Sequence, residues 1–276
     1  IKKWSEASEY ILEKKEQALE GKLIELFGPQ MRAKLDLLAH KKFSFHDHDI
    51  PISKNGMTKK AILKSSLHVD KMLDILNNNR HKFKTLLGLI RPPGHHACTQ
   101  ECAGFCYLNN IILATKLAFE KGYKKIAIID FDLHTGDGTL REVKSLKNVH
   151  FLNLFCKDQY PFNPSYTYQH QRIAYQPFSH ILNIALEDQI SWDHGYRREL
   201  INGLEWFPDS ENYDLVLISA GFDGTRVDRE SGFLGRKGFN LEPRDYEEMI
   251  KLIIQNFPNA QYLILTEGGY NPDSFA

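Results

Sequence analysis

Short apolar runs recur along the chain, and segments with helical spacing separate them. Five runs have the length and composition of buried strands: 126–129, 149–154, 181–185, 215–219 and 262–265. A sixth, residues 86–90, stops where Pro92 and Pro93 follow, because proline cannot continue a strand ladder. Five segments have helical spacing: 4–20, 58–78, 107–120, 194–206 and 246–257.

The alternation of strand-like and helix-like segments predicts the fold class. It indicates an α/β protein with a mainly parallel sheet flanked by helices on both faces. The chain has no internal repeat, low-complexity tract or linker, so a single domain over residues 1–276 is expected. In such folds, ligands bind beyond the carboxyl ends of the strands, and the polar motifs of this chain follow those ends.

Composition narrows the functional class. The 276 residues carry 35 basic and 35 acidic side chains, and this balance argues against nucleic-acid binding through bulk electrostatics. No apolar run approaches the roughly 18 residues of a membrane span, and the first ten residues do not form a signal peptide. Four cysteines in a chain of this length favour a reducing compartment. We therefore expect an intracellular protein, cytoplasmic or nuclear, with no membrane association.

Candidate metal ligands follow two of the predicted strands. Asp132 and His134 alternate at period two after residues 126–129, so their side chains project to the same side. Nitrogen and carboxylate oxygen suit zinc. Taken alone, this pattern fits solvated or helix-capping polar residues equally well. Asp223 follows a second strand and would complete a three-ligand open site.

The chain also carries groups for proton transfer. His95 and His96 stand in a tight loop after Gly94, and a neutral imidazole beside a metal-bound water can take its proton. Asp130 and Asp137 are available to orient these imidazoles. Tyr270, on a Gly-Gly turn, could donate a hydrogen bond to an oxyanion. Together these groups have the composition needed to hydrolyse an amide.

Five segments occur in an order that resembles the zinc-dependent histone deacetylase family: residues 91–97, 104–110, 130–139, 219–223 and 267–271. The likeness is to class II members and to bacterial deacetylase and acetylpolyamine amidohydrolase relatives. It covers residues 86–276, with weaker similarity from about Met31. It implies an arginase/deacetylase-like fold, and a deacetylase catalytic domain over residues 1–276, trimmed at both ends.

The resemblance also implies a role for each matching position. Zinc would be held by Asp132, His134 and Asp223. His95 would pair with Asp130 and His96 with Asp137, His96 being the general base, and Tyr270 would stabilise the oxyanion. The implied substrate-binding positions are Gly104, Phe105, Phe162, Asn163 and Gly268. Family members also hold potassium through main-chain oxygens, for which the candidates are Asp130, Asp132, His134 and Leu154.

Two positions depart from the family pattern. Thr135 stands where a second histidine is usual, and Asn163, with Phe162 and Tyr160 nearby, stands where an aromatic residue usually forms the second wall of the substrate tunnel. The implied activity is hydrolysis of the acetyl or other acyl amide of a lysine side chain in a protein or peptide, with sensitivity to hydroxamates.

Two alternatives remain open. The first is hydrolysis of a small acetylated amine such as a polyamine, for which Glu230 could supply an acid, although Leu234 and Gly235 could occupy that place instead. The second is a catalytically weak binding or scaffold homologue. The segment His46-Asp47-His48-Asp49 looks metal-binding but matches no family ligand, and we expect it on a rim loop.

Overall fold

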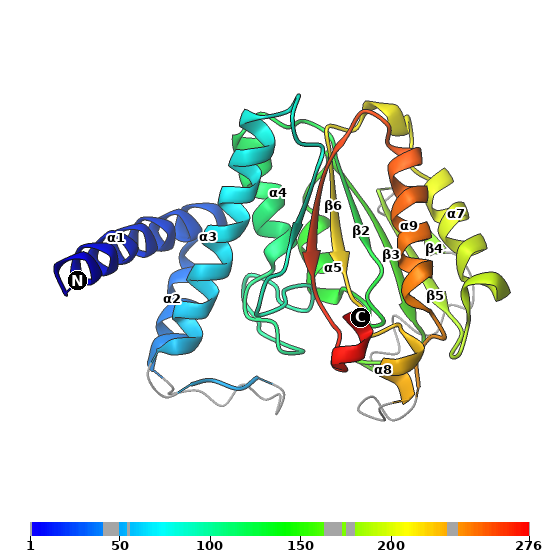
Figure 1. Ribbon diagram of the computed structural model, residues 1–276, viewed down its shortest axis with the longest axis horizontal. Coiled ribbons are helices and arrows are strands. Elements are labelled where there is room, and N and C mark those ends of the chain that lie inside the picture. The colour runs from blue at the N-terminus through cyan, green and yellow to red at the C-terminus, as the bar shows by residue number, and fades with distance from the viewer. Residues whose placement is uncertain are drawn as a thin grey trace.

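A computed structural model describes residues 2–40, 50–53, 56–162, 173–174, 180–230 and 237–275 of the chain. A single sheet runs through its centre with helices on both sides (Figure 1). The sheet order is β1-β7-β6-β2-β3-β5-β4, and every neighbouring pair is parallel except β4 and β5. The predicted α/β class and the mainly parallel sheet are therefore confirmed.

Each predicted apolar run forms a strand. The parallel strands are β1 (Thr85–Gly88), β2 (Ile126–Asp130), β3 (Val149–Cys156), β5 (Ile181–Leu186), β6 (Leu215–Ala220) and β7 (Gln261–Thr266). The antiparallel edge strand β4 (Ile173–Ala174) was not predicted, because two residues are too short to show a periodic pattern. The central strands β2, β6 and β7 are buried along their whole length, which explains why they are continuous apolar runs.

Successive residues of the central strands contact two separate cores, because side chains alternate between the faces of a sheet. Ile126 and Ile128 of β2 pack in the core that includes helices α3 (Met57–Asn78), α4 (Asn110–Glu120) and α5 (Asp137–Val143). Ala127 and Ile129 pack in the other core, under α7 (Arg197–Glu205) and α9 (Pro243–Asn256). Figure 1 shows these two groups of helices on opposite sides of the sheet.

The N-terminal helices differ from the prediction. The helix expected over residues 4–20 extends as α1 (Lys2–Phe27), and a second helix, α2 (Pro29–His40), follows Gly28. The C-terminal part of α1 buries Leu19, Leu23 and Phe27, so this part of the helix packs against the core. Its four-residue apolar spacing lies among many charged residues and is weak in the sequence.

Two helices begin at other residues than predicted. Asn109 is the N-cap of α4, its side chain accepting a hydrogen bond from the Ile112 amide at 3.0 Å, so the helix begins three residues later than expected. Gly56 is the N-cap residue of α3, and the Thr58 hydroxyl accepts from the Ser53 amide instead of capping the helix. The remaining short elements are η1 (Trp192–Tyr196), η2 (Ser210–Asn212), α8 (Arg226–Glu230) and η3 (Pro272–Phe275).

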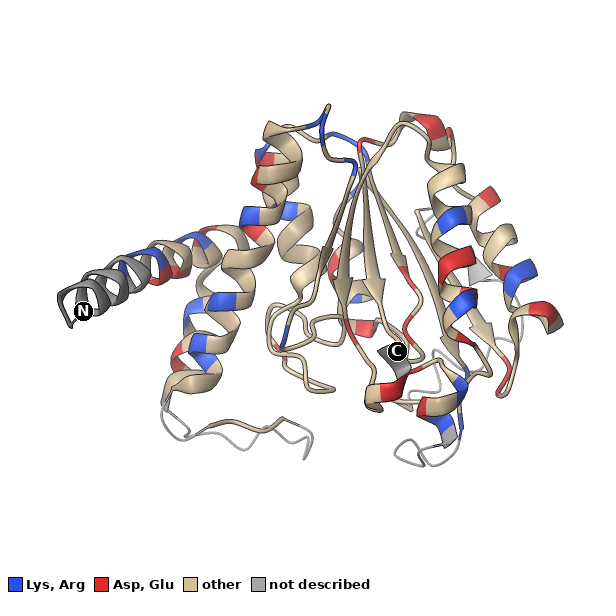
Figure 2. Cartoon of the chain, viewed as in Figure 1, with Lys and Arg blue, Asp and Glu red and all other residues tan. Residues whose placement is uncertain are grey.

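The strand register places the candidate site at one edge of the sheet. Asp130 of β2 pairs with Ser219 of β6, which pairs with Leu265 of β7, so the loops after these three strands start at the same level. This is the lower edge in Figure 1, where α8 and the C-terminus lie, and Figure 2 shows acidic residues at the ends of otherwise uncharged strands. Among the described helices, none is both long and apolar enough to cross a bilayer.

Candidate metal and catalytic site

Two loops bring Asp132, His134 and Asp223 together. The first two follow β2 and the third follows β6, its strand neighbour. His134 Nδ1 lies 3.1 Å from Asp132 Oδ1 and 2.9 Å from Asp223 Oδ2, and the ligand atoms of the three residues all lie within 4.8 Å of one another. All three side chains are buried. This is the spacing and chemistry of a three-ligand site for a divalent metal.

Backbone amides fix the two carboxylates. Gly268 N donates to Asp132 Oδ2 at 2.8 Å, and Leu133 N donates to Asp223 Oδ1 at 3.0 Å. The second oxygen, Asp223 Oδ2, is buried and accepts no hydrogen bond of normal geometry from the described residues. A buried carboxylate oxygen in this state is stabilised by a cation. The donor set and this buried oxygen, which lies 2.9 Å from His134 Nδ1, both fit a bound divalent metal.

Glycines allow the backbone to approach these carboxylates. A Cβ atom on Gly221 would lie 2.1 Å from Asp132 Oδ2, and a Cβ on Gly268 would lie 2.3 Å from Asp223 Oδ2. Both distances are far below van der Waals contact, so any side chain at either position would displace a ligand. The glycines of the 219–223 and 267–271 motifs are therefore explained by close packing around the carboxylates.

The electrostatics of the three residues also favour a cation. Burial lowers the pKa of His134, but hydrogen bonding to Asp132 and the carboxylate of Asp223 outweigh it and raise the pKa to about 9. Burial and the negative charge of Asp132 raise the pKa of Asp223 to about 6. A proton on His134 thus occupies the place between two carboxylates that a metal ion would take, and metal binding would release it.

The tandem histidines lie on the loop after β1, each against its own carboxylate. His95 Nδ1 is 3.1 Å from Asp130 Oδ2, and His96 Nδ1 is 2.8 Å from Asp137 Oδ1. The two imidazole centroids are 4.1 Å apart. Because each Nδ1 is held by a carboxylate, each Nε2 is left to act, and His95 Nε2 lies 3.7 Å from Asp132 Oδ1.

The two imidazoles differ in charge. Burial and the positive charge of His95 lower the pKa of His96 to about 4, so His96 is neutral near pH 7. For His95, burial again opposes the charged form, but the carboxylates of Asp132 and Asp130 outweigh it and raise the pKa well above the usual value. One neutral and one protonated imidazole side by side is an arrangement suited to acid–base chemistry.

Tyr270 reaches the site from the loop after β7. Gly269 has φ 137°, which glycine adopts readily, and the next amides, Tyr270 N and Asn271 N, donate to Asp228 Oδ2 at 2.7 and 3.1 Å. Burial, with the nearby carboxylates of Asp223 and Asp132, raises the pKa of the Tyr270 phenol, which therefore stays a hydrogen-bond donor.

Aromatic side chains stand over the histidines. Gly104 and Phe105 both have positive φ, 53° and 62°, and a Cβ on Gly104 would lie 2.2 Å from the His96 ring. The Phe105 ring lies 6.4 Å from the Tyr270 ring in an edge-to-face arrangement. The Tyr160 ring contacts His96, since their ring centroids lie 4.8 Å apart.

The structure describes only some of the predicted wall and rim residues. Phe162 packs against Tyr160 at 6.1 Å and is 68% exposed. Asn163, the 46–49 segment and Leu234 with Gly235 lie outside the described residues. Thr135 is well packed, because its Oγ1 accepts from Asn153 Nδ2 at 2.8 Å. All four cysteines are free.

Sequence reasoning gave no role to two carboxylates at the site, Asp228 and Glu267. Asp228 holds the Tyr270 loop, and Glu267 accepts hydrogen bonds from the amides of Gly94 and His95. Glu267 lay inside a motif that we identified, but a carboxylate that binds backbone amides has no signature in sequence, since its partners depend on how distant loops fold.

Comparisons with known proteins agree with this geometry. The protein-family model of the histone deacetylase domain matches residues 8–276 of this chain. Histone deacetylase 4 of Caenorhabditis briggsae is 32% identical over 201 residues, which are 71% of this chain and 22% of that protein. The chain therefore spans about a fifth of the length of this relative.

Two solved structures share the fold. The HD domain of HDA15 superposes with a TM-score of 0.68 at 24% identity, covering 88% of this chain and 67% of that one. An acetylpolyamine aminohydrolase from Burkholderia pseudomallei superposes with a TM-score of 0.64 at 22% identity, covering 83% of this chain and 62% of that one.

Proposed function

Because this chain belongs to the histone deacetylase domain family, we propose that it is a zinc-dependent hydrolase that removes acetyl or other acyl groups from lysine side chains. The observation that carries the proposal is the buried trio of Asp132, His134 and Asp223, with two imidazole–carboxylate pairs and a phenol around it. The catalytic domain would extend over the whole of residues 1–276.

Asp132, His134 and Asp223 would hold the zinc ion, which supplies an acidified water and a Lewis acid for the amide carbonyl. Gly268 and Leu133 position two of these ligands through their amides. Asp223 Oδ2 supports this assignment, because it is buried beside His134 Nδ1 at 2.9 Å and makes no hydrogen bond of normal geometry there.

His96 would act as the general base, because its imidazole is neutral near pH 7 and is oriented by Asp137. His95, held by Asp130, would carry positive charge and would later return a proton to the departing amine. Tyr270 would donate its hydroxyl hydrogen to the oxyanion that forms at the carbonyl. These groups lie at the carboxyl ends of β1, β2 and β7, in the loops that follow them or, for Asp137, at the first residue of α5.

The substrate would enter between aromatic side chains. Phe105 supplies one apolar wall for the aliphatic stem of an acyl-lysine, and Gly104 would accept the hydrogen bond of the substrate amide through its carbonyl. Tyr160 lies against both His96 and His134, so we assign it the inner part of the second wall, with Phe162 further out. Gly268 leaves room beside the ligands for the acyl group.

We further propose a structural potassium ion at the main-chain oxygens of the loop after β2, near Asp130, Asp132 and His134, with Leu154 of the neighbouring strand β3. The loop is buried, as a site made of main-chain oxygens requires. This ion would act by fixing the loop that carries two of the zinc ligands.

The closest alternative substrate is a small acetylated amine. The likeness of the fold to an acetylpolyamine aminohydrolase supports it, and so does an acid at Glu230, seven residues after Asp223. A non-catalytic scaffold is the weaker reading, because this chain keeps three metal ligands, two imidazole–carboxylate pairs and the tyrosine.

Steady-state kinetics on an acetyl-lysine peptide and on an acetylated polyamine will test this choice. We expect kcat/KM for the peptide to exceed that for the polyamine by about tenfold or more, a difference of about 1.4 kcal/mol in transition-state binding. The reverse order would establish the small-amine alternative, and turnover of neither by zinc-loaded protein would support the scaffold. Purified protein that lacks zinc must be loaded before the comparison.

The Phe105→Ala substitution should weaken binding of the acyl-lysine stem. Losing roughly 50 Å² of apolar contact at about 25 cal/mol per Å² costs about 1.2 kcal/mol, which raises KM roughly eightfold. We expect kcat and metal content to change little, because the substitution alters no metal ligand, histidine or carboxylate of the site. The control is Ile75→Ala, an exposed apolar residue of α3, which should leave KM unchanged. An unchanged KM in Phe105→Ala would remove this residue from the wall.

A further inference from the structure

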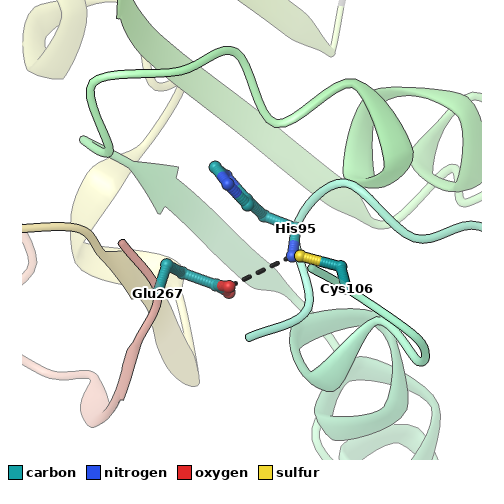
Figure 3. Close-up of side chains that lie close together, drawn as sticks. All are labelled: His95, Cys106 and Glu267. Carbon is teal, nitrogen blue, oxygen red and sulfur yellow. Dashed lines mark hydrogen bonds between the residues drawn. The ribbon is translucent and has the colours of Figure 1, made fainter. Parts of the chain in front are cut away.

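One carboxylate joins the histidine loop to the loop after β7. Glu267 Oε2 accepts hydrogen bonds from Gly94 N at 2.6 Å and from His95 N at 3.1 Å, and Oε1 accepts from Ser219 Oγ at 3.2 Å. Figure 3 shows the bond from the His95 main-chain nitrogen to the Glu267 carboxylate, while Nδ1 of the His95 imidazole is held by Asp130. Glu267 thus holds the backbone of a catalytic histidine without touching its ring nitrogens.

Glu267 also belongs to a group of side chains with the composition of a second metal site. Ligand atoms of His95, Cys106 and Glu267 lie within 4.8 Å of one another. Most of these atoms already have hydrogen-bond partners, however. Both Glu267 oxygens accept hydrogen bonds, the Cys106 thiol donates to Gly104 O at 3.3 Å, and His95 Nδ1 is held by Asp130. Burial also raises the pKa of Cys106 well above its usual value, which disfavours the thiolate that a metal needs.

We propose that Glu267 is a positioning residue that clamps the Gly94–His95 backbone and so sets the place of both imidazoles. One carboxylate oxygen accepts hydrogen bonds from two successive amides, so its position fixes the position of both. Gly94 has no freedom to shift towards the helix behind it, because a Cβ there would already lie 2.5 Å from Asn110 N. The loop is therefore held on one side by α4 and on the other by Glu267.

This inference rests on the proposed function only for its kinetic readout. If the reaction depends on His95 and His96, a displacement of their loop by about 1 Å would cost about 10² in rate. The ground-state fit of an acyl-lysine stem in the tunnel should change much less, since the clamp bonds only main-chain amides of this loop and the Ser219 hydroxyl. The effect of losing the clamp is therefore expected in kcat and not in KM.

Two conservative variants separate positioning from charge. Glu267→Gln keeps the length and an acceptor oxygen but removes the charge. Glu267→Asp keeps the charge but withdraws the oxygens by about 1.5 Å, the length of one C–C bond. We expect Glu267→Gln to retain kcat within about fivefold and Glu267→Asp to lose about 10²-fold, both with KM within about threefold of wild type. If the Asp variant is the more active one, charge and not position is what Glu267 supplies, and the proposal is wrong.

Hydrogen exchange gives a readout that needs no activity. The Gly94 and His95 amides should exchange faster in Glu267→Asp than in wild type, and at nearly the wild-type rate in Glu267→Gln. Ser219→Ala is the matched control, because it removes one bond to Glu267 and leaves both amide bonds in place. It should keep the wild-type exchange at Gly94 and His95. Faster exchange in Glu267→Gln overturns the clamp, even if the Asp variant does not fold.

Measuring the metal content of the variants distinguishes the clamp from a second metal site. All three variants should bind as much metal as wild type, because Asp132, His134 and Asp223 are unchanged. Loss of one metal equivalent in Glu267→Gln would establish a second metal site and overturn the clamp. Should wild-type protein hydrolyse no acetylated amide, the proposed function fails, while the order of amide exchange among the variants still decides the role of Glu267.

Discussion

Asp223→Asn should lose the metal ion and almost all activity while keeping its fold. The asparagine can still accept the Leu133 amide bond through Oδ1, so the loop after β6 keeps its support. It removes the charge that the metal needs, and we expect metal affinity to fall by more than about 10²-fold and kcat/KM by at least about 10³-fold. Elemental analysis of zinc-loaded, desalted protein and assays in excess zinc measure the two effects separately.

The stability of this variant provides an internal control. Burial and Asp132 raise the pKa of Asp223 to about 6, so in metal-free protein the ionised side chain destabilises the fold above that pH. Metal-free Asp223→Asn should therefore melt no lower than metal-free wild type at pH 8. Asp36→Ala, which alters an exposed residue of α2, should change neither metal content nor activity. Full zinc occupancy with wild-type affinity in Asp223→Asn would mean that the trio is not the metal site.

The strands and the position of the site could be predicted because one physical cause produces both. Strands buried on both faces are continuous apolar runs, and polar residues at their carboxyl ends lie on one edge of a parallel sheet. The positions of Asp132, His134 and Asp223 after neighbouring strands were therefore enough to predict that they lie together, as they do in the structure. The two-residue β4 and the apolar stripe of α1 gave no comparable signal.

The supporting contacts could not be predicted, because they join side chains to main-chain amides of other loops. Asp228 and Glu267 read as ordinary acidic residues in sequence, yet each accepts two backbone hydrogen bonds in the site. The left-handed backbone at Phe105 and the position of Tyr160 beside His96 are also products of loop packing. Sequence spacing indicates which residues can react and says less about what holds them in place.

Tyr270→Phe should lower kcat by about 10²–10³-fold, with KM within about threefold of wild type, because it removes the hydroxyl that we propose as the oxyanion donor. The phenylalanine keeps the edge-to-face contact with Phe105. The loop should also keep its shape, since Asp228 holds the main-chain amides of residues 270 and 271 and not the phenol. Metal content should stay at the wild-type value.

Tyr123→Phe is the matched control for this hydroxyl deletion. Tyr123 donates to Gln261 Oε1 at 2.7 Å just before β2, at the opposite end of the sheet from the site. Its loss should cost about 1 kcal/mol of stability and leave kcat unchanged. If Tyr270→Phe turns over an acetyl-lysine peptide at the wild-type rate, the phenol does not stabilise the transition state. If KM rises instead while kcat holds, Tyr270 binds the substrate equally in the ground and transition states, and the oxyanion role passes to another donor.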